Sequence, residues 1–368
     1  MTSISADERQ ALAAAVREAA ETGPRDFLSE DGSLQRDERL WKVLTDQIGL
    51  GGLLADESAG GAGAGIAEVA VVLQELASAL AVVPGLSSLA MAPLSLRVAG
   101  SDPASGLLER LASDVTATVA WPTRWYAHPV PTVGQDGDGW TGRCEVVIDG
   151  ASADVLLVPV RLDSLVGLVA IEGDAEGVTR TPLVGLDLTR ELVMIDLTRA
   201  PGLVLSESFD AAAAFDLTLV ACAAEQVGIA QRCHDAAVAW AKERVQFDRP
   251  IGQFQAIKHL LVDLLMDVEL SRSALDVAID AAQKYLDGPS RESADSLRVA
   301  ARFAASRAGD AATHVADESL HVHGGIGFTW EHDAHLYYRR ARSLEIIHGD
   351  PASHRLDMAR ALLGVTDV

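Results

Sequence analysis

The first third of the chain repeats apolar side chains every three or four residues. Between about Asp7 and Ser113 this pattern is typical of amphipathic helices, and clusters of glycine and proline interrupt it. One apolar stripe runs through Ile66, Val69, Val72, Leu73 and Leu76. The pattern predicts an N-terminal helical domain over residues 1–114.

The middle of the chain changes to short runs rich in β-branched residues. Turn-forming pairs such as Asp149-Gly150 and Gly173-Asp174 separate the runs. The predicted strands are 115–120, 145–148, 155–160, 166–171 and 192–197. They predict a middle β domain over residues 115–209, built as an antiparallel sheet or a small barrel.

Helical periodicity returns in the last part of the chain. One apolar stripe covers residues 217–227 and another covers 261–279. Long successive helices of this kind predict an antiparallel four-helix bundle over residues 210–368. We see no internal repeat and no low-complexity linker, so the predicted fold class is α+β, with an N-terminal helical domain, a middle antiparallel β domain and a C-terminal bundle.

Length and hydropathy restrict where the protein works. With 368 residues and 49% hydrophobic side chains, the chain can bury one large core or several that pack together. The longest apolar runs, such as 69–80, are interrupted well before the roughly 20 residues that a bilayer requires. No membrane segment is predicted, and the N-terminus lacks the basic-then-apolar order of a secretion signal. We therefore expect a cytoplasmic protein.

Charge and cysteine content point the same way. The formal net charge of −23 disfavours general binding to nucleic acid or anionic lipid, so an anionic cofactor needs a local basic site. Three cysteines cannot all pair, and Cys222 and Cys233 lie too far apart on one predicted helix to form a disulfide. This cysteine usage is typical of a reducing cytoplasm.

Segment 244–255 interrupts the helical pattern of the last third. Pro250 and Gly252 end one predicted helix before the next begins. Arg244 and Gln255 offer a guanidinium and an amide, which can hold a diphosphate through forked hydrogen bonds. Taken alone, the segment also fits an ordinary turn with a surface arginine.

Segment 321–328 is a second, glycine-dense interruption. Gly324, Gly325 and Gly327 lack the Cβ atoms that would keep the backbone away from a ligand. Taken alone, it also fits a flexible turn, because glycine often ends helices. A third glycine-rich stretch at 56–65 lacks the preceding strand and the Lys-Ser/Thr ending of a phosphate-binding loop.

Together, the two segments and the order of the three blocks resemble the acyl-CoA dehydrogenase family over nearly the whole chain. In that family the R-x-x-F-x-x-x-I-x-x-F-Q stretch and the Q-x-x-G-G-x-G turn contact FAD that is seated in a neighbouring subunit. The resemblance implies that Arg244 meets the diphosphate, Phe247 packs near the flavin and Gln255 hydrogen-bonds the cofactor. It also implies that the adenosine side is lined by Gly324, Gly325, Gly327 and His321, which replaces the usual glutamine.

The family's catalytic base is missing from both of its usual places. Most members carry a glutamate twenty residues after the aromatic of the glycine turn, where this chain has His348. In a smaller branch the glutamate lies on the first helix of the last block, where this chain has Thr218, followed by Leu219 in place of an arginine. No catalytic residue is therefore assigned to this chain.

The flavin-ring motifs of the β domain are replaced as well. The family's T-E-P-x-x-G-S-D stretch corresponds here to the segment 121–126, and its Trp-x-Thr corresponds to about 146–148. The resemblance therefore implies a base-lacking subunit of an α2β2 acyl-CoA dehydrogenase, several of which act on steroid side-chain thioesters. A catalytically intact partner subunit would hold most of the acyl-CoA, and this chain would complete its FAD site.

Two alternatives remain open at this point. The chain could be self-sufficient, with His348 or Asp350 as a substitute base, because neutral imidazole accepts protons. It could instead be a scaffold or metal-binding protein that uses His321, His323, His332 and His335, although a site needs three or four converging ligands and we assign none. For Glu225 a salt bridge or a helix-surface role is expected, and for Arg339, Arg340 and Arg342 a solvated basic face.

Overall fold

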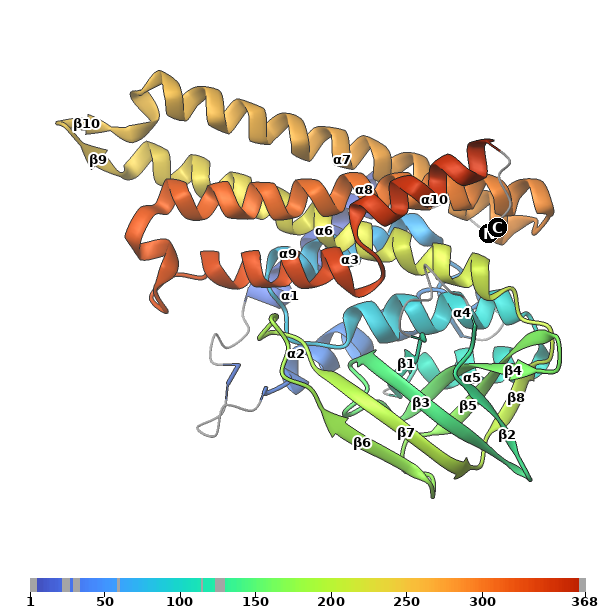
Figure 1. The fold of residues 1–368 in the computed structure, drawn as a ribbon. Coiled ribbons are helices and arrows are strands. Elements are labelled where there is room, and N and C mark those ends of the chain that lie inside the picture. Colours follow the sequence, from blue (N-terminus) through green and yellow to red (C-terminus); the bar gives the residue numbers. More distant parts are fainter. Residues whose placement is uncertain are drawn as a thin grey trace.

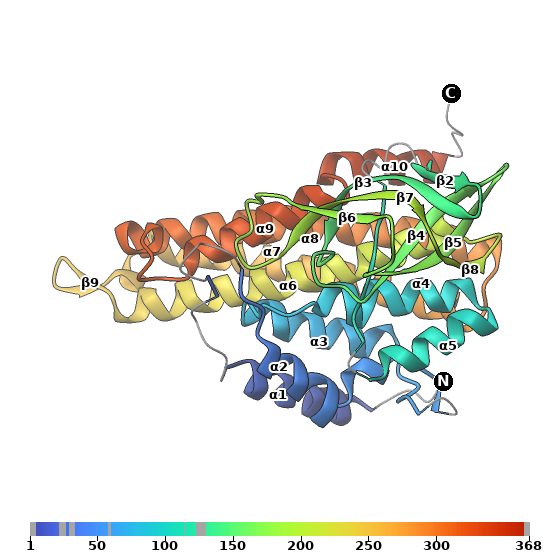
Figure 2. The ribbon, with the colours of Figure 1, turned by 90° about the horizontal axis from the view of Figure 1, so that it is seen from below.

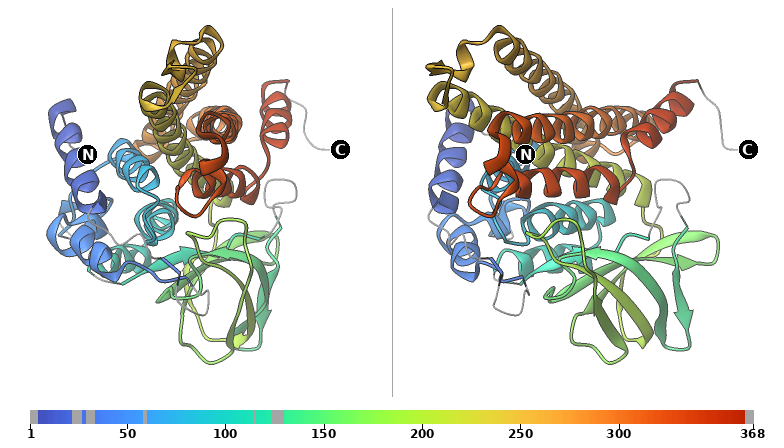
Figure 3. Two further views of the ribbon diagram at one scale, coloured as in Figure 1. Left: turned by 90° about the vertical axis from the view of Figure 1, so that its left-hand side faces the viewer. Right: turned by 60° about the vertical axis from the view of Figure 1, so that its left-hand side comes forward.

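Long helices, short helices and a sheet form three parts of one molecule. The computed structural model describes residues 5–21, 27–28, 34–57, 60–113, 115–122 and 130–363. Figure 1 shows the C-terminal helices above the sheet, and Figure 3 shows the N-terminal helices along one flank of both. This is the helix, sheet, helix order that the periodicity predicts.

The N-terminal part contains helices of moderate length joined by tight turns. Its helices are α1 (Ala6–Glu21), α2 (Glu38–Lys42), α3 (Ile66–Ser78), α4 (Ala92–Ala99) and α5 (Asp102–Leu111), with short π- or 3₁₀-helical segments at Val43–Gln47, Leu50–Gly52 and Gly85–Met91. Helix α3 begins where the Glu68 carboxylate accepts a hydrogen bond from the Gly65 N–H (2.8 Å). Its predicted apolar stripe is buried against α6.

The sheet has eight strands among the described residues. They are β1 (Ala117–Val119), β2 (Val133–Asp136), β3 (Gly139–Ile148), β4 (Val155–Leu162), β5 (Leu165–Glu172), β6 (Val178–Pro182), β7 (Leu192–Ala200) and β8 (Leu203–Ser206). The order is β6-β7-β3-β2-β4-β5-β8, and β1 also pairs with β4. Most pairs are antiparallel as predicted, but β4 pairs in parallel with both β1 and β2.

Five strands coincide with the predicted runs, whereas β2, β6 and β8 were not predicted. Strands β2 and β6 read VGQD and VTRTP, and most of their side chains are exposed or half-buried. An apolar run is therefore absent from them. Backbone pairing with β3 and β7, rather than side-chain burial, holds these short strands in the sheet.

The C-terminal part consists of α6 (Ala211–Glu243), α7 (Gln255–Asp287), α8 (Arg291–His323), α9 (Ala334–Ile347) and α10 (Pro351–Leu363). Helix α6 contacts α3, α7, α8 and α9 (Figure 2), so it needs apolar or small residues on every face. At Gly228 an added Cβ would lie 2.4 Å from the Gln74 carbonyl oxygen of α3. Glycine at this position lets the two helices pack closely.

Helix α6 is also the one described helix that is long and apolar enough to cross a membrane. However, 94% of its apolar window is buried within the protein. Burial of this kind is what a core helix requires, so its hydropathy follows from its central position.

Candidate functional site

A two-stranded hairpin joins α6 to α7 and carries the first predicted segment. Strands β9 (Val245–Gln246) and β10 (Arg249–Pro250) pair antiparallel. The turn residues Phe247 and Asp248 have φ angles of 52° and 62°, as two-residue hairpins require. For phenylalanine this backbone conformation is uncommon and strained. The Phe247 side chain projects into solvent from this turn, with 86% of its surface exposed.

Arg244 and Gln255 flank this hairpin, and the polar groups of both side chains are exposed. The Arg244 N–H donates to the Trp240 carbonyl (2.8 Å), and the guanidinium lies 6.0 Å from the centroid of the Trp240 ring. Within the described part of the chain Arg244 forms no ion pair and the exposed Gln255 side chain forms no hydrogen bond. Both groups can therefore bind a ligand that comes from outside this chain.

The second predicted segment, at the end of α8, forms an open turn. Gly324 has a φ angle of 67°, and a Cβ added at Gly324 or Gly325 would meet no atom within 4 Å. At Gly327 a Cβ would lie 3.1 Å from the His323 Cβ and 3.2 Å from the Leu320 carbonyl oxygen. Gly324 and Gly325 therefore expose backbone, whereas Gly327 also serves packing within the chain. His321 is exposed on the last turn of α8.

Trp240 connects the two segments, a role that the sequence reading missed. Its ring stacks on His323 (5.3 Å between centroids, 30° between planes) and meets the edge of His332 at 6.4 Å. The His323 Nδ1 lies 2.7 Å from the Ser319 carbonyl oxygen, and burial lowers the pKa of His323. A neutral His323 thus packs between Trp240 and His332. The available signal was the position of Trp240, one helical turn before Arg244.

The four histidines occupy three environments, because His323 and His332 lie together, with 4.4 Å between their ring centroids. Among the described residues, His321 lies with Asp317 and Glu318, whose ligand atoms are all within 4.8 Å of one another. His335 instead meets the ring edge of Trp330 at 4.9 Å. The four histidines weighed as metal ligands therefore do not converge on one point in this part of the chain.

The place expected for a catalytic base is filled by packed side chains. His348 follows α9 and lies edge-on to Phe215, with 5.7 Å between ring centroids, and Trp121 meets Phe215 at 5.4 Å. All three are buried. Burial, followed by the charge of Arg190, lowers the pKa of His348 to about 4. A side chain this weakly basic and this enclosed is poorly suited to remove a proton from a carbon acid.

The other candidate bases have structural roles. The Asp350 carboxylate accepts hydrogen bonds from the N–H (2.8 Å) and hydroxyl (3.1 Å) of Ser353 at the start of α10. The hydrogen bond from the Ser353 backbone N–H is the main cause of a lowered pKa at Asp350. Thr218 is fully buried, and its hydroxyl donates to the Ala214 carbonyl (3.1 Å). Geometry thus opposes a substitute base at these positions.

A buried charge cluster lies near His348. The Arg190 guanidinium donates to both Glu225 carboxylate oxygens (2.9 and 2.6 Å), and Arg340 donates to Glu225 at 3.4 Å. Arg340 also lies 4.0 Å from Asp187. These residues connect the segment before β7 to α6 and α9, so the cluster joins the sheet to the bundle. Removing one member would leave a buried charge without its partner, which costs about 3–5 kcal/mol.

This cluster changes two sequence-based expectations. Glu225 forms a salt bridge, as expected, but it is 1% exposed and so does not lie on the helix surface. Arg340 is 2% exposed, so the expected solvated basic face is wrong for this residue. Arg342 is exposed and pairs with Glu345. Arg190 was not predicted, because nothing in the sequence near residue 190 identifies Glu225 as its partner.

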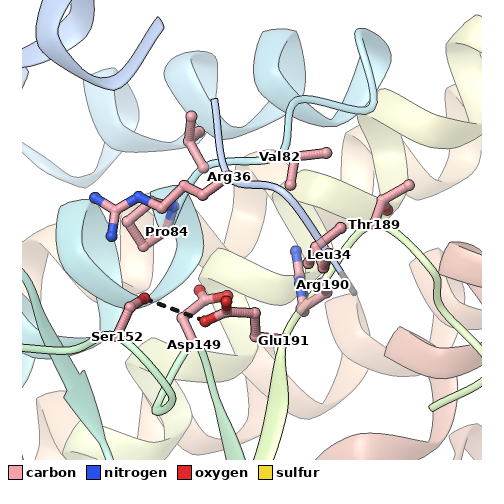
Figure 4. A pocket seen from close by; sticks show the side chains of 10 residues that line it. Leu34, Arg36, Val82, Pro84, Asp149, Ser152, Thr189, Arg190 and Glu191 are labelled. Atoms are coloured by element: carbon pink, nitrogen blue, oxygen red, sulfur yellow. Dashed lines mark hydrogen bonds between the residues drawn. The ribbon is translucent and has the colours of Figure 1, made fainter. Parts of the chain in front are cut away.

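The hollow beside the cluster is too small for a cofactor ring. Asp149, Arg190 and Glu191 line this hollow (Figure 4). Its volume is about 10 Å³, which is room for about one water molecule. The Asp149 carboxylate accepts a 2.6 Å hydrogen bond from Ser87, and burial raises its pKa to about 6. The neighbouring Val147 and Ile148 are 1% exposed. Of the replaced 121–126 segment, residues 123–126 lie outside the described residues.

The chain therefore fits one side of a dinucleotide cofactor. The free guanidinium of Arg244, the free amide of Gln255, the exposed Phe247 ring and the open backbone at Gly324 and Gly325 suit a diphosphate, a ring and an adenosine. The positions that would face the flavin ring from within the chain are packed with apolar side chains. A cofactor on these residues needs a second protein surface to enclose it.

Comparisons with known proteins identify the family of the chain. Residues 6–113 match the family described as "Acyl-CoA dehydrogenase, N-terminal domain", and residues 210–363 match "Acyl-CoA dehydrogenase, C-terminal domain". The chain is 34% identical to Acyl-CoA dehydrogenase IpdE2 of Mycolicibacterium smegmatis over 87% of each chain. It is 32% identical to Acyl-CoA dehydrogenase FadE27 of Mycobacterium tuberculosis over 89% of this chain and 88% of that one.

Two solved structures share the fold and some sequence. A Tcur3481-Tcur3483 steroid ACAD variant aligns with a TM-score of 0.86 and 28% identity, over 97% of this chain and 98% of that chain. The ChsE4-ChsE5 complex from Mycobacterium tuberculosis aligns with a TM-score of 0.81 and 26% identity over 100% of both chains. The predicted family and fold class are confirmed.

Proposed function

Because the chain belongs to the acyl-CoA dehydrogenase family, whose members are FAD-dependent oxidoreductases, we propose that it completes the FAD site of a catalytically intact partner subunit. The complex desaturates an acyl-CoA thioester between its α and β carbons. The observation that carries the proposal is a contrast within one chain. The groups of the hairpin and glycine turn that are proposed to contact the cofactor are exposed, whereas the expected position of the base is occupied by the buried His348.

Bound FAD supplies the hydride acceptor of this reaction. The residues of this chain bind and orient it. Arg244 donates charge-assisted hydrogen bonds to the diphosphate, Gln255 donates or accepts at the cofactor, and Phe247 covers an apolar face. Gly324 and Gly325 would let the backbone approach the adenosine, and His321 would contact its edge. The base that removes the α-proton belongs to the partner.

The substrate is proposed to be a steroid side-chain thioester. One structural relative is a steroid ACAD variant, Tcur3481-Tcur3483, and another is the ChsE4-ChsE5 complex, which has two differently named subunits. The acyl chain binds mainly in the partner, because the described residues around His348 are closely packed.

The test is an Arg244→Ala variant, coexpressed with the acyl-CoA dehydrogenase subunit with which this chain is proposed to pair. Loss of charge-assisted hydrogen bonds of about 1.5–3 kcal/mol should weaken FAD binding to the complex about 10- to 150-fold. Binding is measured by titrating FAD into the deflavinated complex. Subunit composition, measured by native mass spectrometry, should stay unchanged because Arg244 is exposed.

A matched control is Arg291→Ala, which removes a guanidinium whose side chain is 97% exposed at the start of α8. This variant should bind FAD like the wild type. Unchanged FAD affinity in Arg244→Ala would refute the proposed role of the hairpin.

A further inference from the structure

An aromatic stack lies between the hairpin and the glycine turn. The Trp240 ring stacks on His323 with 5.3 Å between centroids and 30° between planes, and the His323 ring lies 4.4 Å from that of His332. The three rings come from α6, from the last turn of α8 and from the segment before α9. This group of three rings, the Trp240 stack, therefore connects segments that are distant in the sequence.

Backbone hydrogen bonds fix both imidazoles of the Trp240 stack. The His323 Nδ1 lies 2.7 Å from the Ser319 carbonyl oxygen, so this nitrogen carries a proton and donates it. The His332 Nδ1 accepts a hydrogen bond from the Ala334 N–H (3.0 Å), so this nitrogen carries no proton. Each ring is thus held in one orientation and one tautomer. Trp240 packs against a surface that the backbone of α8 and α9 keeps in place.

The Trp240 ring also meets the arginine that is proposed to bind the diphosphate. The Arg244 guanidinium lies 6.0 Å from the ring centroid, at the outer limit of a cation–π contact. Arg244 forms no ion pair with any described residue, so contact with the ring limits where the guanidinium lies. A long side chain loses rotamer freedom when a ligand orders it. A ring that already orders the guanidinium lowers this cost, so the ligand binds more tightly.

We propose that Trp240 is a positioning residue for FAD binding, which holds the Arg244 guanidinium and the glycine turn at a fixed separation through its stack on His323. The proposal rests on the proposed function, because the FAD in question belongs to the complex with the partner subunit. Trp240 acts through Arg244 and His323 and not by contact with the cofactor. Gly324 directly follows His323, so loss of the ring releases the guanidinium and the exposed backbone of the turn from each other.

Trp240→Leu in the coexpressed complex tests this role. Loss of the ring should weaken FAD binding about 5- to 70-fold, measured by titrating FAD into the deflavinated complex. Trp240→Phe keeps an aromatic ring at this position and should retain most of the affinity. Trp140→Phe is the matched control, because Trp140 is buried in the sheet. This control should lower the melting temperature without changing FAD affinity.

A double-mutant cycle separates positioning from a general loss of structure. If Trp240 acts through Arg244, the loss of FAD affinity caused by Trp240→Leu should be at least about threefold smaller in the Arg244→Ala background. Equal losses in both backgrounds would overturn the positioning role, and so would a Trp240→Leu complex that binds FAD like the wild type. With either result, weak FAD binding by Arg244→Ala alone would leave the proposed function intact. Unchanged FAD affinity in Arg244→Ala would instead remove the proposed function itself.

Discussion

His348 stands where the family resemblance places a glutamate base, and its surroundings decide its chemistry. The sequence alone left it open as a substitute base. In the structure the imidazole is packed against Phe215, and burial with the nearby Arg190 lowers its pKa to about 4. Its neutral form is a packing residue. The residue type was readable from the sequence, but its basicity depended on neighbours more than a hundred residues away.

The pKa of His348 predicts a pH-dependent contribution to stability. Its folded pKa lies below the unfolded value of about 6.5, so the unfolded chain binds more protons between about pH 4 and 6.5. Its contribution to the free energy of unfolding therefore rises as pH rises through that window. His348→Gln removes this titration. The free energy of unfolding of the variant minus that of the wild type should therefore be about 2 kcal/mol more favourable at pH 5 than at pH 8.

The measurement is urea unfolding of both proteins at the two pH values. The free energy of unfolding is compared between variant and wild type at each pH, because other groups titrate in the same window. Asp149 and Asp216 have pKa values raised to about 6, so their contributions to stability change with pH in the opposite direction and cancel in this comparison. Turnover of the coexpressed complex should be unchanged by His348→Gln. A collapse of turnover would show that His348 is the base after all.

At the scale of elements, the hairpin between α6 and α7 shows the limit of pattern reading. Pro250 and Gly252 correctly indicated that the helices are interrupted, but the strands β9 and β10 contain two residues each and carry no apolar pattern. Their existence depends on the left-handed conformations of Phe247 and Asp248. Long periodic helices such as α7 were predictable, because their burial repeats along the sequence.

The strained hairpin predicts a trade between stability and cofactor binding. Asparagine tolerates the left-handed region better than phenylalanine, so Phe247→Asn should raise the free energy of unfolding by about 1 kcal/mol. The same change removes the exposed ring and should weaken FAD binding to the complex about 2- to 12-fold. Denaturant unfolding and FAD titration measure the two effects.

Asp248→Asn is the matched control, because it places asparagine at the other left-handed position of the same turn without removing an aromatic ring. It should leave FAD affinity unchanged. Equal losses of FAD affinity in both variants would mean that FAD binding depends on the backbone conformation of the turn and not on the Phe247 ring.

At the scale of the whole molecule, the sequence indicated three parts but not how they are joined. Arg190 and Glu225 come from the sheet and the bundle, and Arg340 adds a third segment to the same buried cluster. Pairings between residues this far apart leave no periodic signal. The same cluster lies beside the packed His348, whose pKa the charge of Arg190 helps to lower.

The most direct test of the account compares the chain alone with the chain coexpressed with its proposed acyl-CoA dehydrogenase partner. Flavin content and native mass are measured for both preparations, together with desaturation of an acyl-CoA. We predict a chain that is free of FAD and inactive alone, and a flavin-containing, active hetero-oligomer on coexpression. A fully flavinated homo-oligomer that desaturates a thioester without any partner would contradict the account.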